Sequence, residues 1–70
     1  MSMLIESNNQ LRLDQRVWVK AWWTRPAGTT VRCRVVEIFK TCDYMLTVEP
    51  EEGGNRHRRC VEIADILSVG

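Results

Sequence analysis

Histidine, long apolar runs and a surplus of either charge are what this chain of 70 residues has least of. It has one histidine and no Cys-x-x-Cys pair, so the closely spaced ligands of a structural zinc site are missing. No apolar stretch approaches the ~20 residues that a membrane-spanning helix needs. Ten Lys and Arg oppose nine Asp and Glu. This balance is unlike the strongly basic composition of proteins that coat nucleic acid without specificity.

Cysteine is odd in number, and the start of the chain lacks a secretory pattern. Residues 1–5 contain no basic segment followed by a long apolar run. The three cysteines, Cys33, Cys42 and Cys60, cannot all pair within one chain, and free thiols are typical of a reducing compartment. We therefore expect a cytoplasmic protein with no membrane partner, no metal and no cofactor.

What the chain has in quantity is β-branched and aromatic residues that alternate with polar ones. In residues 16–22, valine and alanine alternate with tryptophan and lysine, which is the period-two pattern of a half-buried strand. A second strand is predicted over residues 29–39. Its apolar positions shift by one after Val35, and such a change of parity predicts a bulge or a sharp bend.

Three shorter strands complete the predicted sheet, over residues 44–48, 56–61 and 66–69. Residues 62–65 carry the signal of a single helical turn before the last strand. Five short strands with frequent turns predict an all-β fold, a small five-stranded barrel with a short 3-10 turn before the last strand.

One domain is the most that this length allows. Residues 6–9 are polar and carry no strand pattern, so we expect residues 1–9 to form a flexible N-terminal arm. Residues 10–70 then form the single β-barrel domain.

Two segments resemble the SH3-like barrels. The opening, residues 13–19, reads Leu-Asp-Gln-Arg-Val-Trp-Val, and the ending, residues 61–67, reads Val-Glu-Ile-Ala-Asp-Ile-Leu. The resemblance covers residues 11–69 and implies the same five-stranded barrel. Proteins of this superfamily include RNA binders, peptide binders and Tudor-like readers, so the resemblance implies a binding module without fixing its ligand.

Within this superfamily, the type II dihydrofolate reductases offer a comparison by residue. Their active pore is lined by Val-Gln-Ile-Tyr, where this chain reads Val-Glu-Ile-Ala over residues 61–64. Glu62 replaces the glutamine and Ala64 the tyrosine. The likeness is therefore to the scaffold, without the residues of that active site.

Arginine occurs in two clusters that a folded sheet can bring together, with tryptophans nearby. Guanidinium groups donate in pairs to phosphate, and aromatic rings stack on bases. This combination predicts a surface for RNA or DNA. The candidate nucleic-acid-binding residues are Arg32, Arg34, Arg56, Arg58, Arg59, Trp22 and Trp23. The alternative is a solvated face on which these arginines pair with Glu37, Glu49 and Glu62.

The tryptophans also support a second hypothesis, a module that binds protein or copies of itself. Trp18 and Trp22 have the same parity, and tryptophan is enriched at interfaces, so these two are the candidate interface residues. No catalytic residue is predicted, because His57 stands without a paired nucleophile. A third reading is an enzyme assembled at an oligomer axis, with rings of Glu62 or His57.

Overall fold

A computed structural model describes residues 5–70 of the chain; residues 1–4, part of the expected arm, lie outside the described residues. The elements within the described residues are η1 (Asn8–Gln10), β1 (Arg16–Ala21), β2 (Thr29–Ile38), β3 (Met45–Pro50), β4 (Arg59–Glu62), η2 (Ile63–Asp65) and β5 (Ile66–Val69). The predicted all-β fold is confirmed, and so is the 3-10 turn before the last strand. No helix in residues 5–70 is long and apolar enough to cross a membrane.

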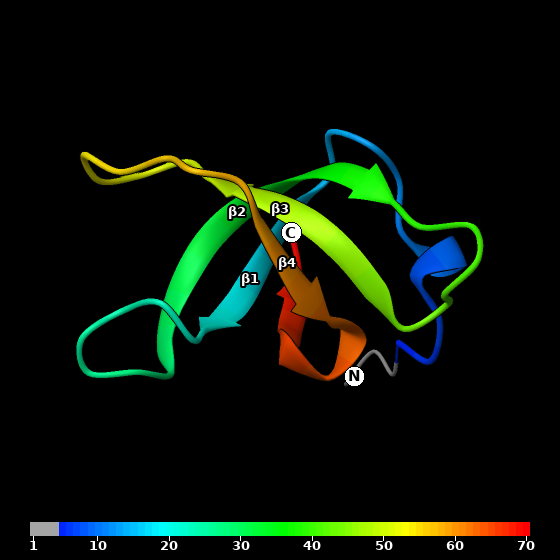
Figure 1. The fold of residues 1–70 in the computed structure, drawn as a ribbon, viewed down its shortest axis with the longest axis horizontal. Coiled ribbons are helices and arrows are strands. Elements are labelled where there is room, and N and C mark those ends of the chain that lie inside the picture. The colour runs from blue at the N-terminus through cyan, green and yellow to red at the C-terminus, as the bar shows by residue number, and fades with distance from the viewer. Residues whose placement is uncertain (1–4) are drawn as a thin grey trace.

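The five strands form one antiparallel sheet in the order β4-β3-β2-β1-β5. The long strand β2 curves through the middle of the fold, and the connections between strands project at both ends (Figure 1). Strands β4 and β5 form the two edges, and no ladder joins them in the described part of the chain. The predicted barrel is thus a strongly bent sheet that is not closed by backbone hydrogen bonds.

One face of this sheet is buried, as the alternating pattern predicts. Every second residue of β1 is inaccessible to solvent, and the core continues across β2, β3 and β4. The fully buried side chains of this core are Val17, Val19, Cys33, Val35, Leu46, Val48 and Val61, and Ala21 is equally inaccessible. Removing this apolar surface from water drives the folding of a chain with so small a core.

The change of parity in β2 is a bulge, as predicted. Val35 pairs with Val48, and Glu37 pairs with Thr47, the residue that directly precedes Val48 in this antiparallel partner. Val36 is therefore left without a partner in the ladder. The extra residue allows the apolar positions on both sides of Val36 to remain in contact with the core.

Strand β3 extends two residues beyond its predicted end at Val48, to Pro50. The next residue, Glu51, donates its backbone N–H to the carbonyl of Arg32 on β2, at 3.0 Å. The nitrogen of Pro50 therefore faces the opposite side, toward β4. Pairing with β4 ends at Val48 and Arg59, so no ladder bond is lost at the proline. Strand β4 correspondingly begins at Arg59, three residues later than predicted.

One buried polar side chain, together with the apolar residues Ile5 and Leu11, attaches the N-terminal segment to the sheet. Asn8 is 3% exposed. Its Nδ2 donates to the carbonyl oxygens of Phe39, Cys42 and Met45, at 2.9, 2.8 and 2.7 Å. Its backbone N–H donates to the carbonyl of Asp43 at 2.7 Å. Figure 1 shows η1 lying against the connection between β2 and β3, which these bonds hold in place.

Replacing Asn8 should destabilise the fold. In Asn8→Ala the buried carbonyls lose their donor, and we expect a loss of about 2–3 kcal/mol in the free energy of unfolding. Asn8→Asp should be worse, because a carboxylate would face carbonyl oxygens. Urea denaturation followed by tryptophan fluorescence measures both. The matched control is Asn9→Ala, at an exposed neighbour; equal stability of Asn8→Ala and Asn9→Ala would contradict the role given to Asn8.

The three thiols should differ in their reactivity. Burial raises the pKa of the Cys33 thiol to about 11, with a smaller opposing effect of Arg59. Cys42 is half-buried and Cys60 is exposed. With iodoacetamide at pH 8, Cys42 and Cys60 should be alkylated in the native protein, and Cys33 only in denaturant. Peptide mass spectrometry identifies the modified residue, and rapid native modification of Cys33 would show that the core is not closed.

Candidate nucleic-acid interface

The side of β1 and β2 that faces away from the core carries a row of cations and one aromatic ring. The register sets Arg16 opposite Arg34, Trp18 opposite Arg32, and Lys20 opposite Thr30. We call these six residues the outer face. Alternate residues on a strand lie about 6.6 Å apart, so the outer face presents regularly spaced side chains along β1.

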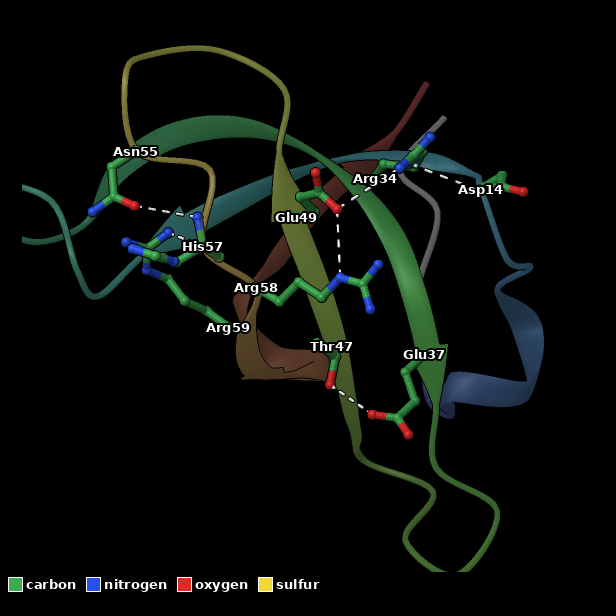
Figure 2. A network of polar contacts seen from close by, with 9 residues as sticks. All are labelled: Asp14, Arg34, Glu37, Thr47, Glu49, Asn55, His57, Arg58 and Arg59. Carbon is green, nitrogen blue, oxygen red and sulfur yellow. Dashed lines mark hydrogen bonds and ion pairs between the residues drawn. The ribbon is translucent and has the colours of Figure 1, made fainter.

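At one end of the outer face, arginines are paired with glutamates. Arg16 Nε lies 3.0 Å from Glu51 Oε1. Glu49 Oε2 lies 3.7 Å from a terminal nitrogen of Arg34 and 3.5 Å from Arg58 Nε. Figure 2 shows Arg34 and Arg58 approaching Glu49 from two sides. Such exposed pairs contribute little to stability, and their charges remain accessible to solutes.

The two arginine clusters of the sequence, one on β2 and one at the start of β4, are in contact through a shared glutamate. Strand β3 lies between β2 and β4. Glu49 of β3 joins Arg34 of β2 to Arg58, which directly precedes β4. Arg56 lines a pocket of about 240 Å³ together with Arg16, Arg34 and both glutamates. Part of the predicted patch is therefore brought together, but with carboxylates among the cations.

Arg32 lies apart from this cluster and over an aromatic ring. Its guanidinium carbon is 5.7 Å from the ring centroid of Trp18, its cross-strand partner. Its buried Nε has no hydrogen-bond partner among the described residues. No carboxylate in residues 5–70 lies within ion-pairing distance of Arg32. The charge of Arg32 is thus uncompensated and is held over the middle of β1.

Arg59 is also separated from the cluster. Successive residues of a strand point to opposite sides of the sheet, so the side chain of Arg59 points away from the side on which Arg58 lies. The guanidinium carbon of Arg59 lies 4.8 Å from the ring centroid of Trp23, and a terminal nitrogen donates to the carbonyl of His57 at 2.7 Å. Trp23 packs against the core. Arg59 and Trp23 are both half-buried, so they are less accessible than a nucleic-acid-binding role requires.

Trp22 is the most exposed tryptophan, with 59% of its surface accessible. Its ring meets Trp23 edge to face, with centroids 5.5 Å apart and planes at 85°. Its Nε1 donates to the carbonyl of Cys60 on β4, at 3.3 Å. These contacts fix the orientation of Trp22, whereas Trp18, the other candidate interface residue, is half-buried beneath Arg32.

Sequence reasoning missed Arg16 and Lys20, because it looked for arginines that are adjacent in sequence. The signal was present in β1, where both residues alternate with the core valines and share the parity of Trp18. Lys20 is exposed and, in residues 5–70, has no carboxylate partner within ion-pairing distance.

No catalytic arrangement is found in the described residues. His57 is exposed, and its only recorded contacts are through its backbone. Partial burial, followed by the neighbouring Cys42 thiol and two carboxylates, raises the pKa of Cys60, which reduces the fraction of reactive thiolate at neutral pH. A hydrogen bond with Cys42 is the main cause that raises the pKa of Tyr44. Within residues 5–70, no group of three or more His, Cys, Asp and Glu side chains could hold a metal ion.

Comparison with known proteins gives no relative: no protein-family model, no curated protein and no solved structure matches the chain.

Proposed function

We propose that this chain is a small non-enzymatic binding module that contacts single-stranded RNA or DNA along the outer face. The observation that carries the proposal is the position of Arg32. It lies uncompensated on Trp18, between the arginines Arg16 and Arg34 at one end and Lys20 at the other. We also propose that the bent five-stranded sheet belongs to the SH3-like barrels, on the order of its elements.

The chemistry of these side chains suits a single strand. Guanidinium forks donate in pairs to phosphate oxygens, and an ammonium adds a further point charge. The exposed ring of Trp22, at the end of β1, offers a surface on which an unpaired base can stack. Bases in a duplex are already stacked on each other, so aromatic side chains favour unpaired segments.

The glutamates limit the strength of this binding. Glu49 and Glu51 neutralise part of the charge of Arg16, Arg34 and Arg58. Only a few phosphates can then be contacted by uncompensated cations, which are Arg32, Arg56 and Lys20 in this part of the structure. We therefore expect modest affinity and a shallow dependence on salt.

A protein-binding or self-assembling module is the second candidate, and the sheet edges favour it. Strands β4 and β5 each present an edge that pairs with no strand in the described residues. Leu67 of β5 is 52% exposed. A second copy could extend the sheet at such an edge. Light scattering over a range of concentrations separates this candidate from a monomeric nucleic-acid binder.

Neutralising Arg32 tests the first proposal. Arg32→Gln should weaken binding of a labelled single-stranded oligonucleotide by about three- to tenfold and reduce the salt slope by roughly 0.7, the value for one phosphate contact. Arg32→Lys, which keeps the charge, should retain most of that slope. Fluorescence anisotropy at several salt concentrations measures both quantities.

The matched control is Arg12→Gln, because Arg12 is exposed and its side chain makes no recorded polar contact with the described residues. It removes the same charge away from the outer face. If the two glutamine variants bind with the same affinity and the same salt slope, the outer face is not the binding surface.

A further inference from the structure

A second pocket opens at the end of the outer face, between the connection that follows β1 and the turn η2. It has a volume of about 270 Å³ and is lined by Lys20, Ala21, Trp22, Ala27, Gly28 and Asp65. This volume is just below the range of pockets that bind drug-sized molecules. A single planar ring system is therefore the size of occupant that it suits.

The shape of this pocket depends on a glycine. Gly28 has a φ of +91°, a conformation that other residues rarely adopt. A Cβ atom at this position would lie 3.3 Å from Cε of Lys20. The absence of a side chain lets the aliphatic part of Lys20 lie across Gly28, so that its stem forms part of the wall.

The polar groups of the pocket are one cation and one carboxylate that are not paired with each other. Neither Lys20 nor Asp65 has an ion-pair partner within residues 5–70. Asp65 Oδ2 accepts a hydrogen bond from the backbone N–H of Glu62 at 3.2 Å, while Oδ1 accepts none from the described residues. The pocket thus offers an aromatic ring, one donor group and one free acceptor.

On the basis of the proposed function, we infer that this pocket is a nucleobase subsite that selects bases with an exocyclic amino group, cytosine above uracil. The amino group of cytosine can donate to Asp65 Oδ1 while the ring stacks on Trp22. Uracil has a carbonyl oxygen at that position, which would face the carboxylate and be repelled. The ammonium of Lys20 can bind the adjacent phosphate, and it disfavours a cationic occupant.

Cytosine and uracil are matched probes of the same ring size. They differ in the group at C4, amino in cytosine and carbonyl in uracil, and in the proton that uracil carries on N3. Oligocytidylate should bind about three- to tenfold more tightly than oligouridylate of equal length, the effect of one hydrogen bond. Intrinsic tryptophan fluorescence should be quenched on binding, because Trp22 lines the pocket.

The discriminating variant is Asp65→Asn. An asparagine oxygen can still accept the hydrogen bond from Glu62, so the turn η2 should be retained; thermal unfolding checks this. The amide can also donate to the uracil carbonyl, so the preference for cytosine should be lost or reversed. Arg32→Gln serves as the control, because it should weaken both oligonucleotides equally and leave their ratio unchanged.

The outcomes separate this inference from the proposed function. Binding of both oligonucleotides with equal affinity in the wild type would overturn the base selectivity and leave the outer face as a binding surface. A preference for cytosine that persists in Asp65→Asn would overturn the role of Asp65. Saturable quenching by a tetra-arginine peptide, with none by either oligonucleotide, would assign the pocket to a cationic peptide and overturn both proposals.

Discussion

The core of this protein is one face of a single bent sheet, so the alternation of side chains along β1 and β2 is the constraint on which the rest depends. Every second residue of β1 must be apolar for the sheet to exclude water. The residues between them therefore point to the opposite face of the sheet, toward solvent. Arg16, Trp18 and Lys20 occupy one line for that reason, and any ligand of the outer face meets them in that order.

Charge on this surface is compensated at one end and free at the other. Glu49 and Glu51 come from the end of β3 and the residue after it, and they reach the arginines near the start of β1. No acidic side chain of β3 extends this pairing to Arg32 or Lys20. The chain is nearly neutral as a whole, with a formal charge of +1, yet the sheet separates paired from unpaired cations over the length of one strand.

Most strands of the fold could be predicted from the local spacing of apolar residues. The side-chain contacts of the candidate site could be predicted less well. The strand at Arg16–Ala21, the bulge after Val35 and the turn before the last strand were all predictable from the spacing of apolar residues. Pairing of Arg34 and Arg58 with Glu49 was one of the two alternatives that the sequence left open. The position of Glu49 between these two arginines could not be predicted, because it depends on β3 lying between β2 and β4. The burial of Asn8 was hidden for a similar reason: its partners are backbone carbonyls, which leave no mark in the sequence.

The bonds of Asn8 also bear on the order in which the chain folds. Its three carbonyl partners lie 31, 34 and 37 residues away. Phe39 and Cys42 belong to the connection that joins β2 to β3, and Met45 is the first residue of β3. Closing so long a loop costs entropy before these bonds can form, whereas the β1–β2 and β2–β3 hairpins need only local closure. The N-terminal segment should therefore dock after the hairpins have paired. Asn8 then acts mainly on the unfolding rate. Its replacement should raise the rate of unfolding more than it lowers the rate of folding.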